Sequence, residues 1–429
     1  MFVLWFQQKE SCSLHCGRRE YKVRLSPSPP GVSERRRSTD LGLRRRFRIE
    51  RFETLNHAQR SQTRHAADSG ASVAKTRGGK RDARFGEEND RVSGKNRSRK
   101  AEELRQRAVS EKEKIGFSFG GHKFLLESVI QDTLPEGSDV GTVVAVHGSP
   151  GSHKDFKYIT PLLQQKGIRF IGINFPGYGQ TQGDERLIQD NTERMKYVQA
   201  VVNHLDLKKN LVFLGHSRGT ENALKMAAMN TDKTVGLVSA NFIGIRTHRG
   251  IKPTWVIEFI DFLWQLGWPT RWLMRPVLHY VYNNVIKLRV PSADVAAWSL
   301  SGMVPWKVDL PGQEVYVDKL NQSGVKSLLV YAGKDPLIEP EISKEFAGLF
   351  KGNHHYECDT KVKEDEESRR QVVEAFEGGA KSVSVYFKHE DHFLQKHQAK
   401  LSPTESASCW PERTNRLLFV NMQMFTLCS

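Results

Sequence analysis

The sequence predicts an α/β protein with a doubly wound, mostly parallel sheet of eight strands. Three observations predict this fold class. Short runs of wholly apolar residues recur along the chain, which is typical of strands covered on both faces. Helical stretches separate most of these runs, and such an alternation builds a parallel sheet with helices on both sides. A long stretch without strand signals then predicts a helical insertion in the later half of the chain.

The expected strands lie between residues 115 and 386. The first two form a hairpin, because Gly120 and Gly121 stand between them and supply the turn. The strands are expected at residues 115–119, 122–129, 142–146, 169–174, 211–214, 235–238, 327–331 and 382–386. Helices are expected at residues 155–165, 190–205 and 220–229.

Residues 245–323 form the helical insertion, which is expected to cap one end of the sheet. They contain six of the chain's eight tryptophans. On a helix over Thr254–Trp268, the side chains of Trp255, Phe259 and Phe262 share one face. Two interpretations remain open: this aromatic face belongs to the core of an ordinary subdomain, or it forms a lid that faces a ligand.

The first 110 residues differ in composition from the rest of the chain. They hold 27 Lys and Arg against 13 Asp and Glu, whereas the remaining residues hold 38 basic and 36 acidic side chains. The net charge of +16 therefore belongs mainly to one segment, which argues against a uniformly basic nucleic-acid-binding protein. Apolar residues are sparse in residues 1–110, so we expect a disordered basic tail. A tail without a defined partner is the preferred interpretation; contact with nucleic acid or an acidic membrane, nuclear import and an organellar presequence are the alternatives.

The five cysteines are odd in number and scattered, so they do not indicate a disulfide framework. A reducing compartment is therefore expected. The cytoplasm is the first choice, and the mitochondrion or the nucleus is the alternative if the basic segment acts as a signal. Cys12, His15 and Cys16 lie close together, but no second Cys/His pair lies at zinc-finger spacing, and no metal is expected. No apolar run reaches the roughly 18 residues that a membrane-spanning helix needs.

A serine between two glycines follows the fifth expected strand. The segment Gly215–Gly219 has the sequence Gly-His-Ser-Arg-Gly and joins the apolar run at 211–214 to the helix expected from Thr220. A sharp strand–turn–helix connection leaves the hydroxyl of Ser217 free above the sheet, while the glycines let neighbouring chain pack closely. A serine hydroxyl becomes a nucleophile when a base removes its proton. Ser217 is therefore the candidate nucleophile.

A second loop, His147–Ser152, follows the expected strand at 142–146. Acyl transfer develops negative charge on a carbonyl oxygen, and preorganised backbone N–H groups that point at it lower the barrier. Such a set of donors is called an oxyanion hole. The candidate donors here are the backbone N–H groups of Ser149 and of Arg218, the residue after the candidate nucleophile. His147 is interpreted as a support for the loop rather than as the catalytic base.

Four motifs, in this order, resemble those of the α/β-hydrolase superfamily. They are the loops at residues 147–151 and 175–181, the segment 215–219 and the segment 333–337. The helical insertion after the next strand is similar to the caps of epoxide hydrolases, haloalkane dehalogenases and small esterases, and to a hydrolase-like branch of unknown function. The resemblance implies an α/β-hydrolase domain over residues 111–400, with the cap at 245–323.

The resemblance also implies the chain order nucleophile, acid, histidine. The acid is then Asp335, with Glu339 or Glu341 as substitutes. The histidine is His392, because the sequence His-Phe-Leu matches the family's usual ending; His389 is the alternative.

The chain departs from the family pattern in three places. Asp391 stands where a glycine commonly precedes the histidine, which puts the geometry of that loop in question. Asp335 and His392 are 57 residues apart, and the charged excess at residues 361–370 is interpreted as a surface insertion. Residues 401–429 show no obvious closing helix and form an uncertain C-terminal tail.

Epoxide hydrolases and dehalogenases of this superfamily attack with an aspartate, so Ser217 argues against both activities. The resemblance implies a carboxylesterase- or lipase-type serine hydrolase, in which His392 is the base and Asp335 fixes its tautomer. The expected substrate is a small-molecule or lipid-like ester with an apolar portion, and neither metal nor organic cofactor is expected. The alternatives are an amide or peptide hydrolase, since the loop at 147–151 also resembles that of proline iminopeptidases, and a non-catalytic binding protein. The oligomeric state stays open.

Overall fold

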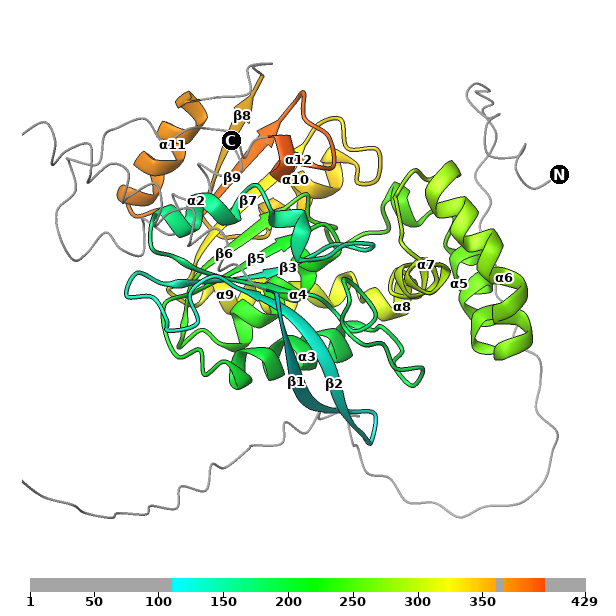
Figure 1. Cartoon of the computed structure of the whole chain (residues 1–429). Coiled ribbons are helices and arrows are strands. Elements are labelled where there is room, and N and C mark those ends of the chain that lie inside the picture. Colours follow the sequence, from blue (N-terminus) through cyan, green and yellow to red (C-terminus); the bar gives the residue numbers. More distant parts are fainter. Residues whose placement is uncertain (1–109, 360–365, 398–429) are drawn as a thin grey trace, which may run out of the picture. The chain divides into compact units, whose positions relative to one another are not determined.

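The computed structural model describes residues 110–359 and 366–397. Within these residues the core is a nine-stranded sheet in the order β1-β2-β4-β3-β5-β6-β7-β9-β8 (Figure 1). β1 and β2 form an antiparallel hairpin, β2 pairs antiparallel with β4, and all other neighbours are parallel. The strands are β1 (Ser110–Phe119), β2 (His122–Asp132), β3 (Thr142–Val146), β4 (Arg169–Ile173), β5 (Leu211–His216), β6 (Thr234–Ala240), β7 (Lys326–Ala332), β8 (Asn353–Cys358) and β9 (Ser382–Phe387). The prediction of a doubly wound, mostly parallel sheet is confirmed.

Three predicted segments lie wholly or largely outside the described residues. They are the basic tail up to residue 109, the C-terminal tail at 401–429 and the first half of the charged stretch at 361–370, whose residues from 366 onward begin the helix α11 (Glu366–Glu377). The expectations for these segments therefore stay predictions.

The predicted count of eight strands is one too few, because β8 is not among them. Its sequence, Asn-His-His-Tyr-Glu-Cys, is largely polar, and only Cys358 at its end is buried. β8 is the last strand of the sheet and pairs with β9 alone. An edge strand does not need apolar residues on both faces, so a search for buried apolar runs misses it.

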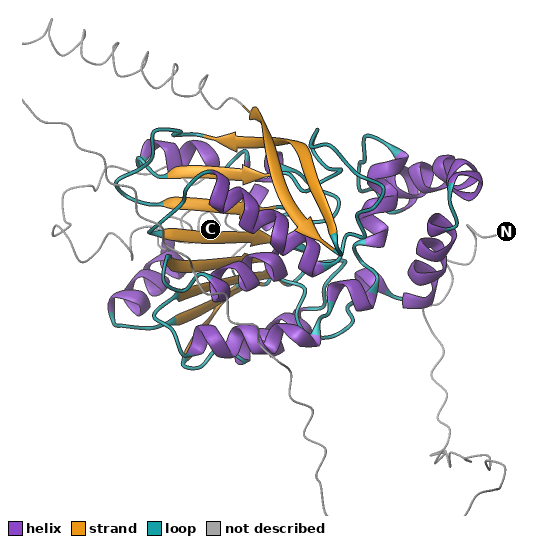
Figure 2. Cartoon of the chain, turned by 90° about the horizontal axis from the view of Figure 1, so that it is seen from below, coloured by secondary structure: helices purple, strands orange, loops and turns teal. Residues whose placement is uncertain are grey.

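Helices cover both faces of the sheet (Figure 2). One group consists of α3 (Asn191–His204), α4 (Gly219–Met229), α9 (Glu314–Asn321) and α10 (Pro340–Gly348), and the other of α2 (Thr160–Gln165), α11 (Glu366–Glu377) and α12 (Leu394–His397). In β3, Val144 and Val146 belong to the core under the first group, and Val143 and Ala145 belong to the core under the second. All four side chains are fully buried, which is why the strand is a continuous apolar run.

Between β6 and β7 the described chain forms helices and no strand. These are η3 (Arg249–Ile251), α5 (Thr254–Gln265), α6 (Trp268–Tyr280), the π-helix η4 (Val281–Val285), α7 (Ala293–Ser301), α8 (Pro305–Val308), η5 (Pro311–Gln313) and α9. We call the part from α5 to α8 the cap. Within residues 110–359 and 366–397, no helix combines the length and the apolarity that crossing a membrane requires.

The aromatic face predicted on the first cap helix is turned outward. Trp255, Phe259 and Phe262 are 59 %, 54 % and 58 % exposed. The interpretation as the core of a subdomain is therefore wrong for these three side chains, and the interpretation as a lid that faces a ligand stays a prediction. The opposite side of α5 packs against the molecule through the buried Trp264.

The cap is fixed to the loop after β4 by Trp298 of α7. Gly177 and Gly183 face the Trp298 ring so closely that a Cβ on either glycine would collide with it. Gly177 also has a φ of +86°, a conformation that residues with a Cβ rarely adopt. Close approach and backbone conformation together explain a glycine at position 177.

Candidate active site

Ser217 lies in a sharp turn between the end of β5 and the start of α4. Its φ of +51° is in the left-handed region, which is uncommon for a residue other than glycine. Its backbone N–H donates to the Ala240 carbonyl at 2.9 Å, which fixes the turn to the end of β6. Gly215 and Gly219 meet backbone atoms so closely that neither position has room for a Cβ. The turn therefore has the form that the sequence predicts.

The structure brings Ser217, His392 and Asp335 together. The hydroxyl of Ser217 donates to Nε2 of His392 at 3.0 Å, and Nδ1–H of His392 donates to Oδ2 of Asp335 at 2.7 Å. His392 and Asp335 are each 5 % exposed, whereas Ser217 is half-buried. One hydrogen-bonded line thus runs from a buried carboxylate through an imidazole to a hydroxyl that retains access from outside.

Asp335 is held ionised by its surroundings. Its Oδ1 accepts the backbone N–H groups of Leu337 at 2.8 Å and Ile338 at 3.1 Å, while Oδ2 accepts from His392. Burial alone would raise the pKa of Asp335, but the hydrogen bond and charge of His392 and the two backbone donors outweigh it, so the pKa lies below its ordinary value. The carboxylate is therefore charged at neutral pH and orients the imidazole.

The alternative acid and base residues have other partners. Glu339 accepts from the backbone N–H of Arg249 at 2.8 Å and pairs with Lys252, and Glu341 is exposed. His389 bonds through Nε2 to Asp359 at 2.8 Å.

His147 supports the neighbouring loops. Its ring is buried, Nδ1–H donates to the Gly148 carbonyl at 2.7 Å, and Nε2 accepts the backbone N–H of Phe175 at 3.2 Å. Burial, followed by the positive charge of Arg194, lowers the pKa of His147 to about 3, so the ring is neutral. This agrees with the interpretation of His147 as a structural residue.

The two candidate oxyanion donors belong to segments that lie next to Ser217. A Cβ on Gly148 would lie 3.1 Å from Cβ of Ser217, so the loop that carries Ser149 passes beside the nucleophile. Arg218 caps the N-terminus of α4, where the first backbone N–H groups have no acceptor within the helix. The geometry is compatible with the predicted oxyanion hole.

Both candidate donors are tied to the cap helix α7 through their side chains. The Ser149 hydroxyl donates to the Ser299 carbonyl at 3.4 Å, and Nε of Arg218 donates to the Gly302 carbonyl at 3.0 Å. Arg218 is fully buried and pairs with Glu221 at 2.8 Å. The position of the cap is therefore coupled to the loops around Ser217.

Two residues that hold the candidate base in place are not among those predicted from the sequence. His216 donates from Nε2 to the backbone carbonyl of His392 at 2.9 Å, and Asn241 donates to the same oxygen from Nδ2 at 2.9 Å. Burial and the nearby His392 lower the pKa of His216 to about 3, so its ring is neutral. The position of Asn241 directly after β6, at the edge of the sheet that carries Ser217, is the signal that could have found it.

A cavity of about 610 Å³ lies beside the site. Its walls include the loop at 150–152, Asp155, the cap segment 287–291 and Phe393, which follows His392. The walls are partly apolar, through Leu288, Phe393 and the prolines, and two cations, Lys287 and Arg289, stand on the cap side. The volume lies within the range of small-molecule sites.

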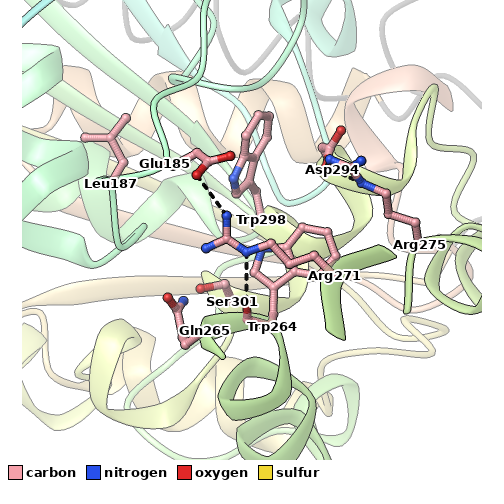
Figure 3. Close-up of a pocket in the computed structure, with 9 residues that line it drawn as sticks. All are labelled: Glu185, Leu187, Trp264, Gln265, Arg271, Arg275, Asp294, Trp298 and Ser301. Carbon is pink, nitrogen blue, oxygen red and sulfur yellow. Dashed lines mark hydrogen bonds and ion pairs between the residues drawn. The ribbon is translucent and has the colours of Figure 1, made fainter. Parts of the chain in front are cut away.

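A second pocket, of about 40 Å³, lies where the cap helices meet the loop that carries Glu185 (Figure 3). Nε of Arg271 donates to the Trp264 carbonyl at 2.9 Å, and its guanidinium pairs with Glu185 at 3.2 Å. The volume admits a few water molecules at most, so the role of Arg271 here is to tie the cap to the body. Among the described residues, no group of three or more His, Cys, Asp or Glu could hold a metal ion.

The chain is similar to several proteins of known sequence or structure. A family model described as "Alpha/beta hydrolase of unknown function (DUF1057)" matches residues 113–406. The uncharacterized protein F35H12.5 of Caenorhabditis elegans is 36 % identical over 280 residues, which cover 63 % of this chain and 78 % of that protein. The uncharacterized hydrolase YugF of Bacillus subtilis is 30 % identical over 105 residues, covering 24 % of this chain and 38 % of YugF. A solved structure of an esterase from Thermogutta terrifontis is 15 % identical, with a TM-score of 0.46, and covers 74 % of this chain and all of the esterase.

Proposed function

Because the chain belongs to a family of alpha/beta hydrolases of unknown function, we propose that it is a serine hydrolase that cleaves carboxylic esters through an acyl-enzyme on Ser217. The observation that carries the proposal is the hydrogen-bonded line from Asp335 through His392 to Ser217. A binding protein has no need of all three groups in this order.

The first half of the proposed reaction forms the acyl-enzyme. Nε2 of His392 takes the hydroxyl proton as Oγ of Ser217 attacks the ester carbonyl carbon. The carbonyl oxygen becomes an oxyanion, which the backbone N–H groups of Ser149 and Arg218 stabilise. His392 then gives its proton to the alcohol oxygen as the C–O bond breaks, and the alcohol leaves.

The second half returns the free enzyme. His392 removes a proton from water, and the resulting hydroxide attacks the acyl carbon. The bond from that carbon to Oγ of Ser217 breaks, and the imidazole returns the proton to the serine. Asp335 stays ionised throughout and stabilises the imidazolium that forms twice in the cycle. Neither a metal nor an organic cofactor takes part in these steps.

The cavity beside Phe393 supports a substrate with an apolar portion. Two of its walls directly follow proposed site residues in the chain, since the loop at 150–152 follows Ser149 and Phe393 follows His392. This supports a substrate whose acyl or alcohol group extends from Ser217 into the cavity. The outward-facing aromatics of α5 give no support to an apolar substrate, because they do not line this cavity.

Hydrolysis of p-nitrophenyl esters of increasing acyl length tests the proposal. We expect the purified chain to release p-nitrophenol and the Ser217→Ala variant to retain no rate above background. Ser118→Ala is the matched control, since Ser118 is exposed at the end of β1, and it should keep the full rate. Equal rates in wild type and Ser217→Ala would overturn the assignment, and absence of hydrolysis of any ester by folded wild type would favour a binding role.

A further inference from the structure

Exposed apolar side chains are concentrated on two helices of the cap. Of the sixteen large apolar residues that are exposed in the described part of the chain, eleven lie between residues 255 and 286. The aromatic members are Trp255, Phe259, Phe262, Trp268, Trp272 and Tyr280. We call the outer side of α5 and α6 that carries these six residues the cap face.

The cap face is the regular outer side of two fixed helices. Along α6, Trp268, Trp272 and Tyr280 recur at intervals of four and eight residues, which places them on one side of the helix. The inner sides pack against the rest of the molecule, Leu278 of α6 being buried in the main core. On α5, Asp261 forms a buried ion pair with Lys307 at 2.8 Å. α7 packs against both helices from the side of the sheet (Figure 1).

From these observations we propose that the cap face docks the protein on an anionic phospholipid surface. Tryptophan and tyrosine suit the boundary between lipid headgroups and acyl chains, because each ring has an apolar body and a polar tip. α5 and α6 have 12 and 13 residues, fewer than the roughly 20 that span a bilayer, so the helices lie on the surface.

Charge complementarity selects an anionic surface. Lys287 and Arg289 follow η4, which continues α6 along the chain; both are exposed, and neither forms an ion pair with another described residue. Glu258 is the single exposed acid on α5 and α6. A second copy of the chain would offer these cations little counter-charge, since the same face would meet itself. Lipid phosphates supply that charge in full.

Docking brings the cavity toward the lipid. Lys287 and Arg289, which we expect to contact the headgroups, also line the cavity beside Phe393. A lipid ester then has a short path to Ser217. This access to Ser217 rests on the proposed function, whereas the docking of the cap face on lipid does not rest on it.

Flotation of the full chain with vesicles tests the proposal. We expect binding to vesicles of phosphatidylcholine mixed with phosphatidylglycerol, weaker binding to phosphatidylcholine alone, and a loss of the difference at high salt. The triple variant Phe259→Ser/Trp268→Ser/Trp272→Ser should lose about a hundredfold in partition coefficient. Lys287→Gln and Arg289→Gln should each weaken binding to the mixed vesicles by about fivefold.

The matched control replaces exposed apolar residues outside the cap face. Leu125→Ser/Trp306→Ser/Val315→Ser should bind vesicles like wild type. Ser217→Ala should also bind like wild type, because loss of ester hydrolysis in this variant tests the proposed function and not the docking. If the triple variant does not fold, bromine-labelled phospholipids should still quench the tryptophan fluorescence of wild type, and absence of quenching overturns the proposal.

Three results would overturn it. Binding that persists in the folded triple variant would assign vesicle contact to another part of the chain, such as the basic segment before residue 110. Absence of binding to both kinds of vesicle would remove the lipid partner. A dimer that light scattering detects in wild type and not in the triple variant, without vesicle binding, would assign the cap face to a second copy.

Discussion

The ring of His216 donates a hydrogen bond to the backbone carbonyl of His392, and this contact joins the residue before the candidate nucleophile to the candidate base. Asn241 gives the same oxygen a second donor. Burial keeps His216 neutral, with its pKa near 3, so the contact persists across the ordinary pH range. The loop after β9 is thus held by two side chains, His216 and Asn241, that carry no proposed chemistry of their own.

Removal of the His216 donor should displace the imidazole of His392. We expect His216→Phe, which keeps the ring volume, to lower kcat by about a hundredfold with a smaller change in KM, because a small misplacement of the base is costly. His216→Gln, which restores a donor, should recover part of the loss. Steady-state kinetics on one ester measures both; equal kcat values in all three proteins would show that the contact has no positioning role.

Two histidines near the end of β9 should differ sharply in effect. His392→Ala removes the proposed base and should lower kcat by about 10⁴-fold or more, whereas His389→Ala should leave it within about twofold, because His389 contacts Asp359 on the surface. Parallel rate measurements compare the two variants. A larger loss in His389→Ala than in His392→Ala would reverse the assignment.

Rate measurements on variants should also distinguish Asp335, the proposed acid, from Glu339. Asp335→Asn preserves the shape of the side chain but removes the charge that fixes the imidazole tautomer, so kcat should fall by about 10⁴-fold. Glu339→Gln should keep nearly the full rate, since Glu339 accepts the backbone N–H of Arg249 and pairs with Lys252 rather than with His392. The assignment to Asp335 fails if the two variants lose activity equally.

The lowered pKa of Asp335 has a consequence for stability. Its folded pKa lies below the ordinary value of 3.8, so its ionisation stabilises the fold above that pH, and the contribution is lost as the pH falls through the folded pKa. The difference in free energy of unfolding between wild type and Asp335→Asn should therefore narrow on acidification. Urea titrations at a series of pH values measure it, and a difference that widens would contradict the pKa direction.

The contact between Gly177 and Trp298 should make position 177 intolerant of a side chain. Gly177→Ala requires a left-handed backbone for alanine and a shift of the indole, so we expect it to destabilise the fold by about 2–5 kcal/mol. Gly348→Ala is the control, because nothing lies near its Cβ position in α10, and it should stabilise by up to about 1 kcal/mol. Chemical denaturation gives both values; equal stabilities would show that the cap does not depend on this contact.

The central strands could be predicted because their side chains are buried on both faces. Val143 to Val146 in β3 illustrate this, since burial selects apolar residues at every position. β8 could not be found in this way, because its outer positions face solvent. The two loop motifs, Gly215–Gly219 and the loop after His147, could be placed because glycine marks backbone that needs close packing.

The cap shows a limit of what can be predicted from the periodicity of apolar residues. The spacing of Trp255, Phe259 and Phe262 correctly groups them on one face of a helix, but periodicity does not reveal what that face contacts. Asn241 illustrates a second limit: its position directly after β6 could mark it as a candidate, but its role depends on a hydrogen bond to a residue 151 positions later, which the local sequence does not reveal.

Labelling of Ser217 by a fluorophosphonate probe tests the central claim most directly. We expect a single covalent adduct on Ser217 of the folded wild-type chain, located by peptide mass spectrometry, and much slower labelling in His392→Ala. Wild type that stays unlabelled, or an adduct that still forms in Ser217→Ala, would contradict it.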